Sequence, residues 1–443
     1  MPLPRFLSSR YLVLAGAVLM TACLGATYSW SVFVPEIRSL TGLSQGAVQL
    51  PFSVFYLAFP ITTLFAGPLI ARLGTRWCTL LGGLIFGGGW MIAGWGGCGW
   101  RFAFTVAGIG VLGGIGVGVA YIVPIAACVR WFPERKGLVT GIAVAGFGGG
   151  AAAVSHVAGI LMSKGGLAPF AAFQILGEGG KMPEVSPCRG GLTPFETFQM
   201  LGIAFTILVC ATAAFMRFPK IAKAAFADRA LAGSAPAAFG APLAASDDAP
   251  ARFRRVVCEP AFQVLYFAMF AGLVAGFTVN ANLKSLSSSG AGQAGVAAVS
   301  LFALANAAGR IAWGWFFDRL RMAPVIAPAV NLVLQAALLL AAPWLLQSVP
   351  GLQALAILAG FNYGGVLVLY ASTVSVRWGA ERVGHVYGWL FSANIPAAAA
   401  PLVAGAIYDR WRTFSPSLVA IAILLMAAAG VALSRRDALK REL

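Results

Sequence analysis

AVSLFALANAAGRIAWGWFF, residues 298–317, is the stretch that decides the fold of this chain. As a helix it is long enough to cross a hydrocarbon layer of about 30 Å, and Arg310 is its only ionisable residue. A guanidinium at that depth costs at least about 2.5 kcal/mol, so Arg310 should face a polar cavity. Asn306 lies one helical turn away on the same face, where its amide can orient the guanidinium or a bound anion. The pair predicts half of an anion site, and the alternative is a structural lock in which Arg310 pairs with a carboxylate or helix-end carbonyls.

The composition shows whether the chain folds in water or in a lipid bilayer. A mean hydropathy of +0.84, with 59% hydrophobic and 10% charged residues, excludes a soluble domain of 443 residues. We therefore expect an all-α membrane protein with twelve transmembrane helices. The expected spans are residues 11–35, 45–70, 77–98, 102–129, 138–162, 197–216, 260–282, 293–317, 324–346, 351–376, 384–407 and 414–434.

The distribution of positive charge predicts the orientation. With the N-terminus in the cytosol, most of the 31 Lys and Arg residues fall in cytosolic segments, as insertion requires. We expect a multi-pass protein of the cell (inner) membrane with both termini cytosolic, and Lys284 in a loop on the other side. The excess of basic residues is then explained by contacts with anionic lipid headgroups, so no nucleic-acid partner is expected.

A change in composition divides the chain. Residues 217–257 are rich in Ala and Pro and carry no long apolar run, which predicts a cytosolic linker between six-helix halves at 1–216 and 258–443. Residues 166–177 return as residues 191–202 with eight of twelve positions identical, which indicates a local duplication in an external loop. The duplication is either a lid over the outward mouth or an insertion that a surface loop tolerates.

Two short basic stretches have a recognisable pattern. GPLIARLGTR at 67–76 resembles the loop after the second span in the major facilitator superfamily, and GWFFDRLR at 314–321 stands at the equivalent place in the second half. An alanine in the first stretch replaces the family's usual aspartate, and the second stretch lacks the second glycine. The resemblance implies the major facilitator fold and a cytosolic conformational latch formed by Arg72, Asp318 and Arg319.

Longer stretches resemble one branch of that superfamily, the oxalate/formate antiporters and monocarboxylate transporters. They are YSWSVFVPEI at 28–37, the glycine-rich run with WFPERKGL at 114–150, the NAAGRIAWGW region of the eighth span, and residues 361–409. In this branch the arginine of the eighth span binds the carboxylate, which implies that role for Arg310. Oxalate exchangers add a lysine in the eleventh span, and residues 384–407 contain none.

The missing lysine bears on the substrate. A dianion facing one guanidinium leaves net charge in a low-dielectric cavity, whereas a monoanion is balanced, so lactate, pyruvate or formate is favoured over oxalate. An oxalate/formate-type dicarboxylate exchanger is the alternative. Further candidate substrate-binding residues are polar groups of the other spans, each of which has an alternative role at a membrane interface or in helix packing. They are Tyr28, Tyr121, Tyr363, Tyr387 and Asn394.

The transport mechanism stays open between proton symport and anion exchange. The acids fall at span ends or in loops, so a coupled proton would travel with the substrate or on a histidine, although His156 and His385 also suit helix packing. A carboxylate-binding membrane sensor is the alternative of another class. No nucleotide loop, metal-ligand set or catalytic constellation is present, so we expect a monomeric carrier without a cofactor or metal, and no enzyme.

Overall fold

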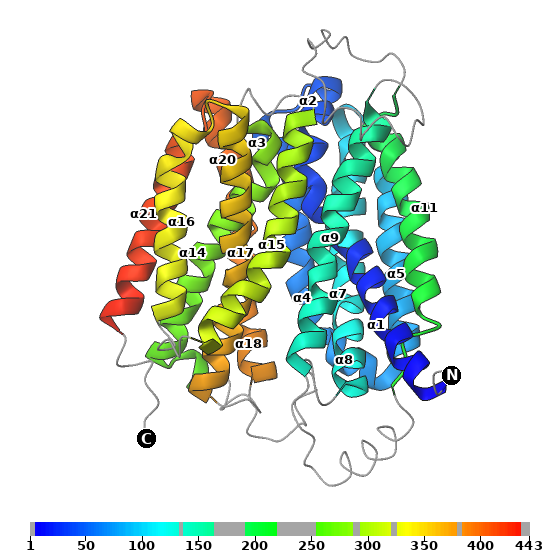
Figure 1. The fold of residues 1–443 in the computed structure, drawn as a ribbon. Helices are drawn as coiled ribbons and strands as arrows, with labels where there is room; N and C mark the ends of the chain where they lie inside the picture. Colours follow the sequence, from blue (N-terminus) through cyan, green and yellow to red (C-terminus); the bar gives the residue numbers. More distant parts are fainter. Residues whose placement is uncertain are drawn as a thin grey trace.

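The computed structural model describes residues 5–132, 136–163, 191–218, 254–286, 293–319, 326–378 and 383–435, which form helices without a strand. Two groups of helices stand side by side (Figure 1). The first group contains α1 (Arg5–Leu24), η1 (Gly25–Val32), α2 (Val34–Thr41), α3 (Gln45–Val48), α4 (Leu50–Leu73), α5 (Thr75–Ala93), η2 (Gly99–Arg101), α6 (Phe102–Thr105), η3 (Val106–Leu112), α7 (Gly113–Ala120), α8 (Ile122–Trp131), α9 (Lys136–Met162) and α11 (Pro194–Thr212). The second group contains α14 (Pro260–Asn282), η5 (Leu283–Ser285), α15 (Gln293–Arg319), α16 (Ile326–Leu345), α17 (Val349–Trp378), α18 (Val383–Phe391), α19 (Asn394–Ala397), α20 (Ala400–Trp411) and α21 (Ser415–Ser434).

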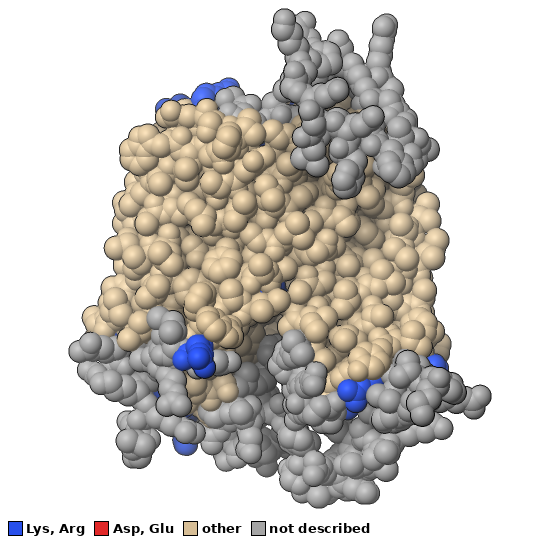
Figure 2. Space-filling model, viewed as in Figure 1, with Lys and Arg blue, Asp and Glu red and all other residues tan. Residues whose placement is uncertain are grey.

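The expected all-α membrane architecture is confirmed. Eleven segments of the described chain are helical, long and apolar enough to cross a membrane. The third expected span corresponds to α5, which has 19 residues but is not among the eleven, because Arg76 and five glycines lower its hydropathy. Figure 2 shows the matching surface, a broad band almost free of charged side chains with basic groups toward its edges.

Three of the expected continuous spans change helix type or break. The first passes from α1 into the 3₁₀ helix η1 at Gly25, and the fourth contains a π-helical segment, η3. The eleventh, predicted as one helix over 384–407, is divided into α18, α19 and α20. Tyr387 and Asn394, predicted to share one helical face, therefore belong to different helices, α18 and α19, which are separated by a turn at Ser392 and Ala393.

The two basic stretches at 67–76 and 314–321 are mostly helical and not loops. Helix α4 continues to Leu73, and only Gly74 separates it from α5. Gly74 has φ 83°, a left-handed conformation that a side chain would strain, which explains a glycine at this one-residue corner. Helix α15 likewise continues to Arg319.

The second copy of the internal duplication begins α11. Thr193 and Glu196 form a capping box: the Glu196 N–H donates to Thr193 Oγ1 (3.2 Å), and the Thr193 N–H donates to Glu196 Oε2 (2.8 Å). The first copy, 166–177, lies outside the described residues, as do residues 219–253 of the expected linker. The division into two six-helix halves at the stated boundaries stays a prediction.

The first helix begins and the last ends at the same end of the bundle, which we call the terminal end, and we call the opposite one the distal end (Figure 1). At the distal end polar contacts join the two groups. Both carboxylate oxygens of Asp409 accept backbone N–H groups, from Gln45 and Gly46, at 2.8 Å each. The side-chain amides of Gln45 and Gln49 donate to Asn282 Oδ1 at 2.8 and 2.9 Å. These contacts hold the distal end closed.

At the terminal end the two groups separate. A cavity of about 470 Å³ lies between α4, α14 and α18. Figure 2 shows the surface hollowed between the two groups toward this end. The cavity is lined by Leu64, Val257, Phe262, Gln263, Tyr266, Trp389 and Ser392.

Candidate functional site

Close packing of α15 against α17 determines where Arg310 lies. A Cβ atom added to Gly309 would collide with the carbonyl of Phe361, and one added to Gly364 would collide with the carbonyl of Asn306. Glycines at such positions allow two membrane helices to approach at backbone distance. The approach places the middle of α15 deep in the bundle, and Arg310 is only 8% exposed.

Asn306 fixes the orientation of the guanidinium. Arg310 Nε donates to Asn306 Oδ1 at 3.1 Å, and Asn306 Nδ2 donates to the carbonyl oxygen of Gly360 at 3.4 Å. This contact has the one-turn spacing that the sequence predicted. Because Nε is engaged within its own helix, the two terminal nitrogens form the free side of the fork.

Tyrosines from both groups of helices surround the guanidinium. Tyr28, Tyr121, Tyr363 and Tyr387 are all close enough to interact with the charge of Arg310. The hydroxyls of Tyr28 and Tyr363 share a hydrogen bond of 3.3 Å that crosses from η1 to α17. The environment of Arg310 is therefore rich in neutral hydroxyl groups.

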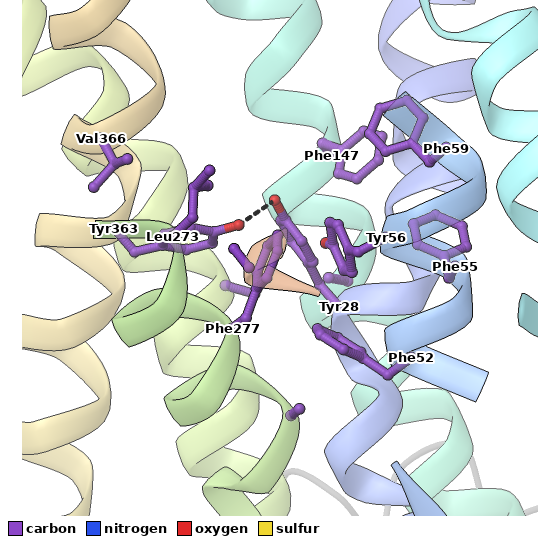
Figure 3. Close-up of a cluster of buried hydrophobic side chains, with 14 of the residues drawn as sticks. Tyr28, Phe52, Phe55, Tyr56, Phe59, Phe147, Leu273, Phe277, Tyr363 and Val366 are labelled. Atoms are coloured by element: carbon purple, nitrogen blue, oxygen red, sulfur yellow. Dashed lines mark hydrogen bonds between the residues drawn. The ribbon is translucent and has the colours of Figure 1, made fainter. Parts of the chain in front are cut away.

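Aromatic rings form the walls around these hydroxyls. Figure 3 shows Tyr28 and Tyr363 meeting between the two groups, with Tyr56, Phe147 and Phe277 around them. The rings of Tyr56 and Phe277 have centroids 4.1 Å apart, and the Tyr28 and Phe147 rings meet edge to face at 5.4 Å. Such walls suit a small ligand with one charged end and an apolar remainder.

No carboxylate of the described residues pairs with Arg310. The ion pairs that the structure describes join Lys284 to Glu36 and Arg377 to Glu259. The lock hypothesis for Arg310 requires a carboxylate or helix-end carbonyls, and its recorded partner is the Asn306 amide.

The structure describes no hydrogen bond or ion pair between Arg310 and the other predicted site residues. Asn394 is 2% exposed, but its amide donates to the carbonyl oxygen of Phe391 at 2.7 Å and thereby stabilises the break before α19. Of the expected latch, Arg72 and Arg319 are exposed and make no hydrogen bond or ion pair to another described residue. The side chain of Asp318 lies outside the described residues.

Sequence reasoning missed two residues, one beside the site and one at the distal end. Tyr56 lies beside Tyr28, and its buried hydroxyl has no hydrogen-bond partner of good geometry among the described residues. Lys284, expected in an external loop, is 5% exposed, and its Nζ lies 2.6 Å from Glu36 Oε1. The signal for Lys284 was available, because it follows Asn280 at the same four-residue spacing as Arg310 follows Asn306.

Comparisons with known proteins agree on the family. The model of the Major Facilitator Superfamily matches residues 15–401. An uncharacterised MFS-type transporter, YhjX, of Escherichia coli is 25% identical over 86% of this chain and 84% of its own length. An oxalate:formate antiporter of Oxalobacter formigenes is 26% identical over 88% of this chain and 82% of its own. An apicoplast pyruvate carrier of Toxoplasma gondii is 27% identical over 86% of this chain and 80% of its own.

Solved structures confirm the fold. A bacterial homolog of the human lysosomal transporter Spinster aligns over 97% of this chain and 98% of its own, with a TM-score of 0.68 and 15% identity. The major facilitator transporter FucP aligns over 96% and 99%, with a TM-score of 0.60 and 14% identity.

Proposed function

This chain belongs to the Major Facilitator Superfamily, and from that premise we propose that it carries a small monocarboxylate anion, such as lactate, pyruvate or formate, bound at Arg310. Its membership makes it a multi-pass secondary transporter and not an enzyme. The observation that carries the proposal is a buried guanidinium without a carboxylate partner among the described residues. A buried charge needs a counterion, and a carboxylate on the free fork supplies it with two hydrogen bonds.

The names of the relatives support a carboxylate. Oxalate, formate and pyruvate, which appear in two of those names, are all small carboxylates. Tyr28, Tyr121 and Tyr363 would offer hydroxyls to the bound anion, and Asn306 would hold the guanidinium. The Tyr387 hydroxyl donates to the carbonyl oxygen of Leu367 at 2.8 Å and would have to release it to reach the anion. The aromatic walls limit the size of the remainder of the substrate.

Charge balance favours a monoanion over oxalate. The described residues 383–435 contain no lysine that could face a second carboxylate. Among the described residues, the other buried cation is Lys284, which is already neutralised by Glu36. One net positive charge therefore remains for the substrate, although the antiporter relative keeps oxalate/formate exchange as the second candidate.

Alternating access fits the two ends of the bundle. The distal end is closed by contacts of Asp409 and Asn282, whereas a cavity opens at the terminal end. We place the terminal end on the cytosolic side of the inner membrane, because the basic residues gather there. A latch that includes Arg72, Asp318 and Arg319 would act at that end after the two halves rock together.

Counterflow in proteoliposomes tests this function. Purified protein is reconstituted with unlabelled lactate inside, and uptake of labelled lactate, pyruvate or formate is measured from outside. We expect at least one of these monocarboxylates to be taken up, with weak competition by excess oxalate. Binding without uptake would instead favour a sensor, and strong oxalate uptake that excludes the monocarboxylates would favour the dicarboxylate exchanger. Repeating the assay with and without a pH gradient distinguishes symport from exchange.

A further inference from the structure

Lys284 and Glu36 form a partly buried ion pair between the two groups of helices at the distal end, in which the Lys284 side chain is 3% and the Glu36 side chain 35% exposed. Lys284 Nζ donates to Glu36 Oε1 at 2.6 Å and to the carbonyl oxygen of Val32 at 3.0 Å. The pair joins η5 to α2 across 248 residues of sequence. Lys284 is thus a second buried cation in the space between the groups, besides Arg310.

One face of α14 leads from the central tyrosines to this pair. A Cβ atom on Gly276 would collide with the ring of Tyr363, so this face points into the site. Asn280 follows one turn later on the same face of α14, and Lys284 lies just beyond the end of α14, in the 3₁₀ helix η5. Asn280 is fully buried, and neither its Nδ2 nor its Oδ1 has a partner among the described residues.

The opposite wall repeats the arrangement on η1. In a 3₁₀ helix residues three apart are eclipsed, so Ser31 lies one turn distal to Tyr28 on the same face. The Ser31 hydroxyl is fully buried and without a partner among the described residues. Glu36 Oε2, at the distal end of this wall, also lacks one.

Unpartnered buried polar groups are destabilising, so Asn280, Ser31 and Glu36 would be stabilised in a state in which they meet a polar ligand or water. In sequence, Asn280 precedes Lys284 by four residues, as Asn306 precedes Arg310, although in this closed state the Asn280 amide makes no hydrogen bond to Lys284. Resting on the proposed function, we propose that Lys284 is a second, distal anion-binding position on the substrate path. Glu36 occupies it in this closed state, and the substrate carboxylate replaces Glu36 when the distal ends separate.

The contrasting hypothesis is a plain strap, in which the pair only ties the two groups together. The two hypotheses differ in the charge that a solute on the path would meet after one partner of the pair is removed. If the pair is a strap that lies off the path, breaking it from either side opens the distal end without placing an uncompensated charge beside a passing solute. Removing Glu36 from an anion position exposes a cation on the path, whereas removing Lys284 exposes an anion.

Charged thiol reagents measure this difference without any assumption about the transported substrate. A cysteine is placed at Ser31 or, in a separate protein on the other wall, at Asn280, in a background with Cys98→Ser and Cys188→Ser. Each protein is labelled from the distal side with an anionic and a cationic methanethiosulfonate. The ratio of the two rates is compared in the parent, Glu36→Gln, Lys284→Gln and the double variant.

We expect the anionic-to-cationic ratio to rise at least about threefold in Glu36→Gln and to fall by a similar factor in Lys284→Gln, with the double variant between them. Using both cysteine positions protects the test against misfolding at one of them. Equal ratios in all four proteins, with both rates raised together, would leave only the strap. Absence of distal labelling at both positions would also overturn the proposal, because neither residue would then line a path. Neither result depends on which anion Arg310 carries.

Discussion

The Arg310 side chain has a positive charge and a planar guanidinium group held in one orientation. The contribution of the planar group to transport can be tested separately from that of the charge. Arg310→Lys keeps the positive charge but loses the fork and the Nε contact to Asn306. We expect carboxylate flux to fall about tenfold to a hundredfold, the equivalent of one strong charged hydrogen bond. Labelled lactate counterflow measures the loss. Arg435→Lys, on an exposed residue at the end of α21, is the matched control, and near-normal flux in Arg310→Lys would contradict the assigned role.

The role of the hydrogen-bonded hydroxyls of Tyr28 and Tyr363 can be tested against a buried hydroxyl that has no partner, which serves as the control. Tyr370 lies two turns along α17 from Tyr363, is fully buried, and has no hydrogen-bond partner among the described residues. We expect Tyr28→Phe and Tyr363→Phe each to raise the KM for the carboxylate about fivefold or more, and Tyr370→Phe to leave KM unchanged. Melting temperatures in detergent identify any loss that reflects folding. Equal KM values in all three variants would remove the pair from the site.

At single residues, the sequence predicted contacts within one helix better than contacts between helices. Arg310 and Asn306 could be paired because four-residue spacing on a helix is a geometric fact. Asn394 could not be placed, because its direction depends on a break in its own span. Lys284 was assigned to a loop because a hydropathy pattern ends at the last apolar residue, whereas helical structure continues through η5 and buries its side chain.

At the scale of the elements, α9 and α15 meet where the two groups of helices touch. A Cβ atom on Gly148 would lie 2.5 Å from the Ala303 carbonyl oxygen, whereas one on Gly149 would meet nothing within 4 Å. Gly148→Val should therefore lower stability by about 1–3 kcal/mol through overpacking, and Gly149→Val should be tolerated. Thermal unfolding in detergent compares the two adjacent substitutions. If both proteins melt alike, the close approach of α9 and α15 is wrong.

The helices themselves could be found from the sequence, but their internal breaks were missed. Hydropathy gives the length of an apolar run but does not distinguish an α-helix from a 3₁₀ helix or a π-helix. The break in the eleventh span had a local signal, because Pro396 and Pro401 lack the N–H groups that a continuous helix needs. The sequence of η1 contains no such proline, and the segment packs against α9 and α15. Gly25, for example, is in such close contact with Phe147 that a Cβ atom there would collide with its carbonyl.

For the whole molecule, two native cysteines report the orientation in the membrane. Cys98 is exposed near the distal end, and Cys258 is exposed near the terminal end, just before α14. If the terminal end is cytosolic, an impermeant maleimide should label Cys98 in intact cells and reach Cys258 only after permeabilisation. Cys98→Ser serves as the control for the external signal, in a Cys188→Ser background. Labelling of Cys258 in intact cells would reverse the orientation.

Helix α5 has a consequence for how the chain enters the membrane during synthesis. It has five glycines and begins with Thr75 and Arg76, so its own partition into lipid is weaker than that of the eleven apolar spans. The single-residue corner at Gly74 leaves no slack between α5 and the strongly apolar α4. We therefore expect the two helices to leave the translocon together as one hairpin, with α4 supplying the driving force and Arg76 kept at the lipid headgroups. Biogenesis of this carrier would then depend on the corner as much as on either helix.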